Sequence, residues 1–120
     1  MITLARVYDA RSADDALHVL VDRLWPRGVH RDDVRIDEWW RDLAPQPALR
    51  TWYGHQGDRF AEFAERYRVD LMADAMQPLL ERARRTAGER GLVLLTATKE
   101  LASSHLMVLA GVIEPDWTQR

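Results

Sequence analysis

Two polar segments of this sequence hold the residue types best suited to binding or transforming a small ligand. The first segment contains Asp22, Arg23, Trp25, Arg27 and Gly28. The second contains Lys99, Ser103, Ser104 and His105. Arginine offers a fork of donors that fits a carboxylate or a phosphate, and histidine is the side chain that exchanges protons near neutral pH. Together these residue types predict a site for a small anion.

Each segment follows a run of residues that predicts a buried strand. Leu17–Leu24 contains the apolar run Val19–Val21 before Asp22, and Pro26 ends it because proline lacks the N–H that a strand needs. Leu92–Ala97 is apolar throughout, which is typical of a strand covered on both faces. Ligands of α/β proteins gather at the carboxyl ends of the strands. We therefore expect Arg23 and Ser103–His105 to lie on the same edge of a sheet.

The remaining elements are predicted from hydrophobic periodicity. Ile2–Tyr8 alternates like a strand, and Arg35–Leu43 places apolar residues at i, i+3, i+4 and i+7, as one face of a helix does. Pro47–Tyr53 predicts a short helix. A long helical region follows, in which Pro78 breaks the helix or starts a new one. Ser103–Ile113 predicts a closing helix that is apolar nearly all round and therefore buried.

This order of elements predicts an α/β fold: a single small domain over residues 1–120, with a mainly parallel three- to four-stranded sheet flanked by helices. The link between the first two strands is too short for a parallel crossover between neighbours. These two strands are therefore either antiparallel, or parallel and separated by another strand.

Every candidate residue also has a purely structural interpretation. Asp22 and Arg23 could form an ion pair at the end of the sheet, and the tryptophans, Trp25 among them, could pack in the core. His105 could cap or pack in its helix. His55 lies between Gly54 and Gly57, which fits either an ordinary loop or a flexible lid that carries an imidazole.

Composition narrows the range of functions. The chain has 120 residues, a formal net charge of −2 and no cysteine, which excludes disulfides, thiolate nucleophiles and cysteine metal sites. The four histidines lack the spacing of metal ligands, and no glycine-rich nucleotide motif occurs, so we expect neither a metal nor a cofactor. The longest apolar run, LMVLAGVI, is too short to span a membrane. The first residues, MITLARVYDA, lack a basic start followed by a long apolar core, so we expect no signal peptide. The net charge argues against nucleic acid as a partner.

Several blocks of the sequence resemble a known family. In order along the chain they read RVYDA, VLVDRLWPRGV, IDEWWRDLAP, LRTWYGH and RFAEFAERYRVDL. They resemble the YeaO-like family of small bacterial proteins, a family of unknown function, from about Arg6 to Ile113. The resemblance implies an α/β fold and a cytoplasmic protein, and it implies no established reaction.

The last block departs from the pattern of that family. Members of that family typically follow their last strand with a basic or acidic pair and then H-N-H-A-V-V-L. This chain has Lys99 where Asp is common, and Ser103 and Ser104 where His and Asn are usual, before His105. His105 matches the second histidine of that pattern. Larger relatives carry a similar V-D-x-R strand end and a C-H-R helix start. Their likeness to Asp22–Arg23 and Ser104–His105 supports one shared pocket.

The main hypothesis is a protein that binds, and in one version transforms, a small anionic ligand at the carboxyl edge of the sheet. Arg23 and Arg27 clamp the anion in this hypothesis, Trp25 or Trp52 forms a wall, and His105, with His55 as second choice, is the catalytic group. One alternative is a nucleic-acid-binding module that uses the Arg- and Trp-rich segment 23–35. Another is a protein-interaction domain with a large apolar surface and no pocket. The sequence assigns no oligomeric state.

Overall fold

A four-stranded parallel sheet organises the fold in the computed structural model, which describes residues 1–119. Its strands are β1 (Ile2–Arg6), β2 (Leu17–Leu20), β3 (Glu38–Trp39) and β4 (Leu92–Thr96). The helices are α1 (Pro47–Tyr53), α2 (Phe60–Leu71), α3 (Gln77–Glu89) and α4 (His105–Ile113). Single turns of 3-10 helix cover Arg41–Leu43, Gly57–Arg59, Asp74–Met76 and Leu101–Ser103. The predicted α/β class and parallel sheet are confirmed.

β4 is a central strand, in the order β1-β4-β2-β3. All five of its residues are buried, as its continuous apolar run predicts. β1 and β2 both pair with β4 in parallel, with Ile2 and Leu17 opposite Leu92. The short link between β1 and β2 therefore joins parallel strands that are not neighbours, which is the second of the two arrangements considered above.

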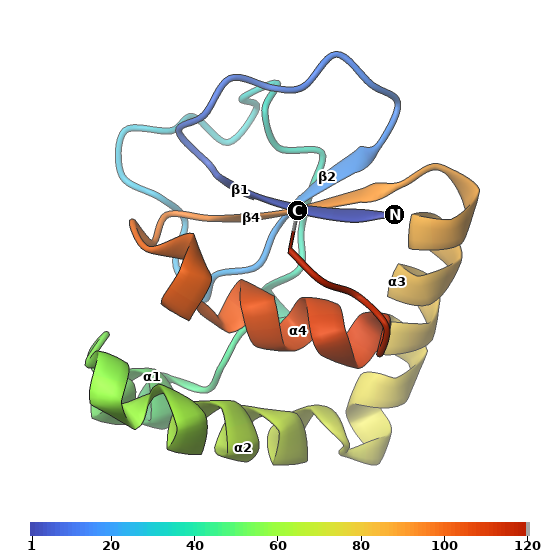
Figure 1. Cartoon of the computed structure of the whole chain (residues 1–120). Coiled ribbons are helices and arrows are strands. Elements are labelled where there is room, and N and C mark those ends of the chain that lie inside the picture. The colour runs from blue at the N-terminus through green and yellow to red at the C-terminus, as the bar shows by residue number, and fades with distance from the viewer. Residues whose placement is uncertain (120) are drawn as a thin grey trace.

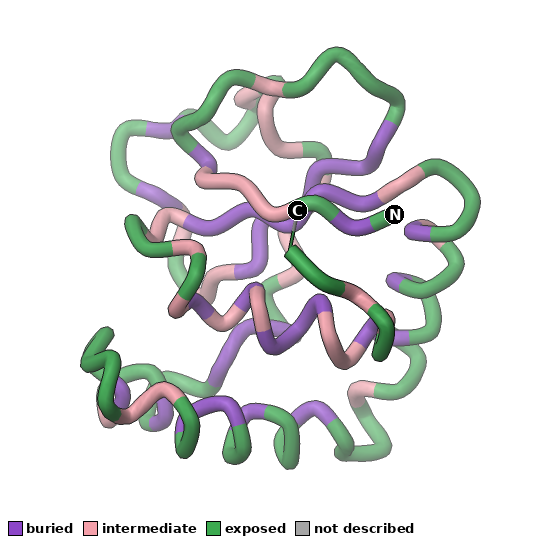
Figure 2. Tube along the Cα trace, in the orientation of Figure 1, coloured by how far each residue is buried: buried purple, intermediate pink, exposed green. Residues whose placement is uncertain are grey.

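The helices lie on one side of the sheet, and the other side is covered by the segments that connect β1 to β2 and β2 to β3 (Figure 1). α4 lies between the sheet and α2, so it is covered from two sides (Figure 2). Its buried residues are Leu106, Val108, Leu109, Ala110 and Ile113. This position explains why the α4 sequence is apolar nearly all round.

The predicted helix over Arg35–Leu43 is wrong, because this segment supplies the edge strand β3 and one 3-10 turn. The Asp37 N–H donates to the His18 carbonyl at 2.8 Å, and the Trp40 N–H donates to the Leu20 carbonyl at 2.7 Å. These bonds satisfy the edge of β2 that a helix would leave without a partner. Trp39 contacts Trp25 edge-on, with ring centroids 5.3 Å apart, whereas Trp40 packs against the core on the helical side. Extended backbone separates the two indoles in this way.

Four other boundaries differ from the predicted ones. β1 ends at Arg6, β4 ends at Thr96, and α4 begins at His105. β2 ends at Leu20, although the Val21 N–H still donates to the Leu95 carbonyl at 2.9 Å. Beyond Val21 the chain turns, and the Asp22 side chain points toward the end of β4. Pro78 lies in the first turn of α3, where its missing N–H costs little.

Glu38 fastens the edge strand to α3. Both of its carboxylate oxygens accept from the Arg82 guanidinium, at 2.7 and 2.8 Å, and one also accepts from the Trp40 indole N–H at 3.0 Å. The hydrogen bonds from Arg82 lower the pKa of Glu38 from its ordinary value of 4.5. A carboxyl with a lowered pKa stabilises the fold above that ordinary value, and the contribution disappears as the pH falls through the lower, folded-state pKa.

We therefore predict that Glu38→Gln lowers the free energy of unfolding by about 0.5–1 kcal/mol at pH 7, a modest value because the pair is partly exposed to solvent. The difference from the wild type should narrow as the pH falls below 4.5. Urea unfolding at several pH values measures both effects. Glu65→Gln is the control. The side chain of Glu65 is 76% exposed, and its ion pair with Arg68 is longer, at 3.8 Å, than the pair of Glu38 with Arg82. A constant difference across this pH range would contradict the prediction.

Candidate functional site

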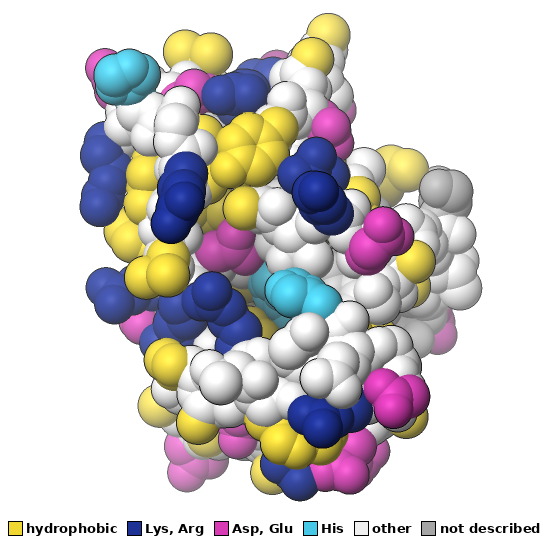
Figure 3. All heavy atoms as spheres, turned by 90° about the vertical axis from the view of Figure 1, so that its left-hand side faces the viewer, with side chains coloured by type: hydrophobic (Ala, Val, Ile, Leu, Met, Phe, Trp, Pro, Cys, Tyr) yellow, Lys and Arg dark blue, Asp and Glu magenta, His cyan; other side chains and the backbone are white. Residues whose placement is uncertain are grey.

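A cavity of about 420 Å³ opens at the carboxyl edge of the sheet. It is bounded by the turn after β2, the segment that leads into α1, and the start of α4. Its lining includes Tyr8, Asp22, Arg23, Leu24, Trp25, Pro26, Arg27, Pro45, Arg50, Tyr53, His55, Phe63, Ser104 and His105. On this face of the molecule, basic side chains surround a hollow in which histidine is visible (Figure 3). Its volume is within the range of about 300–1,000 Å³ that is typical of small-molecule sites.

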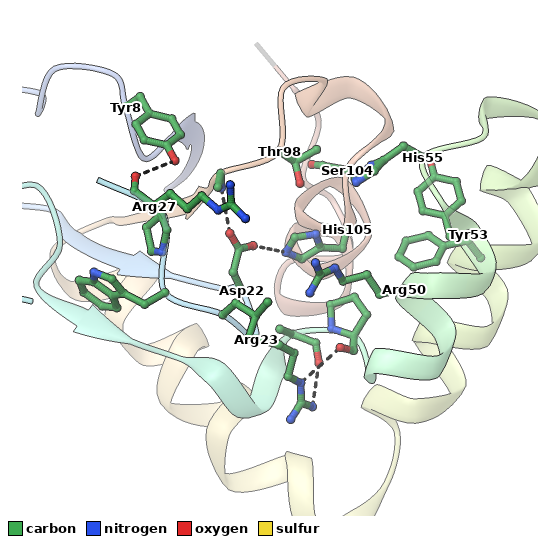
Figure 4. Close-up of a pocket in the computed structure, with 17 residues that line it drawn as sticks. Tyr8, Asp22, Arg23, Arg27, Arg50, Tyr53, His55, Thr98, Ser104 and His105 are labelled. Atoms are coloured by element: carbon green, nitrogen blue, oxygen red, sulfur yellow. Dashed lines mark hydrogen bonds and ion pairs between the residues drawn. The ribbon is translucent and has the colours of Figure 1, made fainter. Parts of the chain in front are cut away.

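Asp22 joins the two strand ends at the floor of the cavity. One of its carboxylate oxygens accepts from the Thr96 hydroxyl at 2.7 Å, and the other accepts from the Ala97 N–H at 2.8 Å. His105 Nε2 lies 3.4 Å from the same carboxylate and also contacts the Val21 carbonyl oxygen. As expected, the ends of β2 and β4 are therefore side by side, with His105 on the same edge (Figure 4).

Arg23 does not pair with Asp22. Its guanidinium donates from Nε to the Pro45 carbonyl at 3.2 Å and from Nη2 to the Ala44 carbonyl at 3.0 Å, and it points away from the Asp22 carboxylate (Figure 4). No ion pair joins Arg23 to Asp22 within residues 1–119. Neither predicted interpretation describes this arrangement fully, since Arg23 lines the cavity and at the same time holds the segment that leads into α1.

Arg27 and Arg50 are the arginines of the cavity that have no partner. Their side chains make no hydrogen bond or ion pair with any other residue in the described part of the chain. Arg27 comes from the turn after β2, and Arg50 comes from α1. Both are exposed, and their guanidiniums lie around the Asp22–His105 pair (Figure 4). The cavity thus contains three guanidiniums and a single carboxylate.

Aromatic residues support the wall beside His105. The Tyr67 hydroxyl donates to the Leu43 carbonyl at 2.5 Å, and the Tyr67 ring meets the His105 ring edge-on at 6.3 Å. Burial raises the pKa of Tyr67 far above its ordinary value of 10.0, so this hydroxyl remains a donor. Tyr53 stacks on Phe63 at 4.3 Å and donates to the Ser103 carbonyl at 2.7 Å, which ties α1 to the turn before α4.

The other predicted site residues divide into two groups. The cavity is lined by Trp25, Ser104 and His55. Two of them already donate hydrogen bonds within the protein: the Trp25 indole N–H to the Val29 carbonyl at 2.7 Å, and the Ser104 hydroxyl to the Leu101 carbonyl at 2.8 Å. His55 lies at the mouth, with a positive φ of 58°. The structure places four predicted residues outside the lining: Gly28, Trp52, Lys99 and Ser103.

Sequence reasoning missed Arg50, Tyr8 and Pro45. Arg50 lies in the block LRTWYGH, three residues before Tyr53, so these two side chains share a face of α1, but no local pattern places that face beside the turn after β2. No group of three or more His, Asp or Glu side chains within residues 1–119 is placed to hold a metal ion. None of the helices in this part of the chain is both long and apolar enough to cross a membrane.

Comparisons with known proteins identify relatives without an assigned activity. A family model described as the inactive DUF488-N3 subclade matches residues 1–120. The chain is 43% identical over 112 residues to an uncharacterised protein of Mycobacterium tuberculosis, covering 93% of this chain and 92% of the relative. It is 34% identical over 116 residues to the uncharacterised protein YeaO of Escherichia coli, covering 97% and 95% respectively. No solved structure matches the chain.

We predict that Arg23 and Arg27 contribute unequally to the stability of the protein. Arg23→Ala removes two hydrogen bonds from a charged group to partly buried carbonyls and should lower the free energy of unfolding by about 1–3 kcal/mol. Arg27→Ala removes a side chain that has no such partner and should change it by less than about 0.5 kcal/mol. Urea unfolding of the two variants measures the difference. Equal effects would contradict the role assigned to Arg23.

Proposed function

The chain belongs to the YeaO-like family, whose matching model is described as an inactive subclade, and from this premise we propose that the protein binds a small anionic ligand without transforming it. The ligand lies in the cavity at the carboxyl edge of the sheet, where Arg27 and Arg50 donate to its anionic group. Asp22 and His105 hold the floor of the cavity in shape.

The observation that carries this proposal is the pair of guanidiniums without partners. A guanidinium that already donates to a carboxylate or carbonyl must give up that hydrogen bond to bind a ligand. Arg27 and Arg50 would instead replace hydrogen bonds to water with hydrogen bonds to the ligand. They come from two different elements, so an anion between them receives donors from two sides. Arginine forms its strongest hydrogen bonds with carboxylates and phosphates.

The surroundings of the polar groups support binding rather than turnover. A hydroxyl nucleophile needs a base within hydrogen-bond reach, yet the Ser104 hydroxyl donates to the Leu101 carbonyl. His105 Nε2 already contacts the Val21 carbonyl and Asp22. His105 is therefore proposed as a positioning residue, and His55 as a side chain of the cavity mouth.

The arrangement of the tryptophans argues against the nucleic-acid alternative. Stacking of bases requires free indole surface, but the Trp25 and Trp39 rings contact each other edge-on, and the Arg31 guanidinium lies 5.0 Å from both ring centroids. The Trp39 indole N–H also donates to the Asp22 carbonyl, at 2.7 Å. The protein-interaction alternative expected a surface without a pocket, and the cavity argues against it.

We predict that inorganic phosphate raises the melting temperature of the wild type and that Arg50→Gln or Arg27→Gln weakens phosphate binding at least about tenfold, since each removes a charged donor. Isothermal titration calorimetry measures the affinities. Arg85→Gln is the matched control, because it removes an exposed arginine of α3 that does not line the cavity. Equal binding by all four proteins, or no binding by the wild type, would overturn the proposal.

We also predict weak binding of random single-stranded DNA at about 0.15 M salt, with a dissociation constant above about 1 μM, because the net charge is −2. Fluorescence anisotropy of a labelled oligonucleotide over a range of salt concentrations measures this. Tighter binding that weakens steeply with salt, and that Arg31→Gln reduces, would favour the nucleic-acid module instead.

A further inference from the structure

The cavity is larger and more apolar than the binding of a bare oxyanion requires. Phosphate or a simple carboxylate is too small to fill about 420 Å³. Beyond the guanidiniums, flat or apolar side chains make up much of the remaining wall, and they are Tyr8, Leu24, Trp25, Pro26, Pro45, Tyr53 and Phe63. This composition is typical of a site that orients a ligand through a few polar groups and holds its body through apolar contact.

Two of these apolar side chains remain in contact with water. Tyr8 is 41% exposed and Leu24 is 64% exposed, and only seven large hydrophobic residues are exposed within residues 1–119. Single exposed apolar residues are ordinary, but these two come from different parts of the chain and line the same cavity. A ligand that covered them would bury apolar surface that the protein alone leaves exposed.

Tyr8 is held in place at the mouth of the cavity. Its hydroxyl donates to the Arg27 carbonyl at 3.3 Å (Figure 4). The Arg6 guanidinium lies 5.2 Å from the centroid of the Tyr8 ring. The Tyr8 ring thus stands next to the turn that carries Arg27. A ligand whose anionic group reaches Arg27 and Arg50 would place the atoms next to that group against Tyr8 and Leu24.

On the premise of the proposed anion site, we infer that the ligand carries an aromatic ring close to its anionic group. The anionic group, a phosphate or a carboxylate, contacts Arg27 and Arg50, and the ring packs against Tyr8 and Leu24. Flat rings pack favourably on one another. An unbranched aliphatic chain would pack less well against the Tyr8 ring. The structure thereby assigns Tyr8 and Leu24 the role of selecting among anions that the arginines alone would bind equally.

The experiment compares matched anions that differ only in the ring. Phenyl phosphate is titrated against methyl phosphate, and benzoate against acetate, by calorimetry on the wild-type protein. Burial of a ring against two apolar side chains should make the ring-bearing anion bind about tenfold more tightly within at least one pair. The pair that shows the preference identifies the anionic group.

Variants assign the preference to named residues. Tyr8→Ala and Leu24→Ala should each reduce the preference for the ring at least about threefold and leave the affinity for methyl phosphate or acetate nearly unchanged. Tyr8→Phe keeps the ring without the hydroxyl and should retain the preference. Val34→Ala is the control, because Val34 is 79% exposed and does not line the cavity. Melting curves without ligand show which variants are folded. If Tyr8→Ala does not fold, the loss of ring preference is tested with Leu24→Ala alone.

The outcomes separate this inference from the proposed function. If the protein binds both members of each pair equally well, the anion site stands and the ring inference is overturned. If it binds none of the four anions, the proposed function fails as well. A preference for the ring that Tyr8→Ala and Leu24→Ala leave intact would also overturn the inference, since the ring would then contact another part of the protein.

Discussion

The carboxylate of Asp22 is the contact on which the geometry of the cavity depends. It accepts hydrogen bonds from the Thr96 hydroxyl and the Ala97 N–H, and it lies 3.4 Å from His105, so it fixes the end of β2 to the end of β4 and to the start of α4. A half-buried carboxylate with fewer donors would cost free energy. Because Thr96 and Ala97 lie at the end of β4 and His105 begins α4, the edge has this shape only when both elements meet Asp22.

The orientation of Asp22 also determines what its neighbour does. The Asp22 carboxylate faces the end of β4. The Arg23 side chain points away from it and donates to the carbonyls of Ala44 and Pro45. That segment leads directly into α1, which begins at Pro47 and carries Arg50 to the cavity. One arginine thus serves the architecture, and by doing so it positions another that is free to meet a ligand.

Local sequence patterns predicted the strand ends and the helices better than they predicted the edge strand and the second arginine of the proposed site. The continuous apolar run of β4 and the polar residues after it suffice to place Asp22 and His105 on one edge, since parallel strands share their carboxyl ends. Trp39 and Trp40 fit a helical pattern, but the free edge of β2 required two backbone partners, and that requirement depends on residues far away in the sequence. Arg50 was missed for the same reason: its neighbours in the cavity are set by the path of Arg23 and Pro45.

The placement of two arginines without a partner in one cavity, rather than the number of arginines, distinguishes this edge from the rest of the surface. Sixteen of the seventeen basic residues are arginine, yet the net charge is −2, because acidic residues balance them. Several of those pairs are direct: Arg11 with Asp37, Arg35 with Asp33, and Arg82 with Glu38. The pairing with Arg35 is close enough to lower the pKa of Asp33 to about 2. A guanidinium engaged in this way attracts a further anion weakly. At the carboxyl edge of the sheet, by contrast, three guanidiniums and one carboxylate line the cavity, and within residues 1–119 neither Arg27 nor Arg50 forms an ion pair with an acidic side chain.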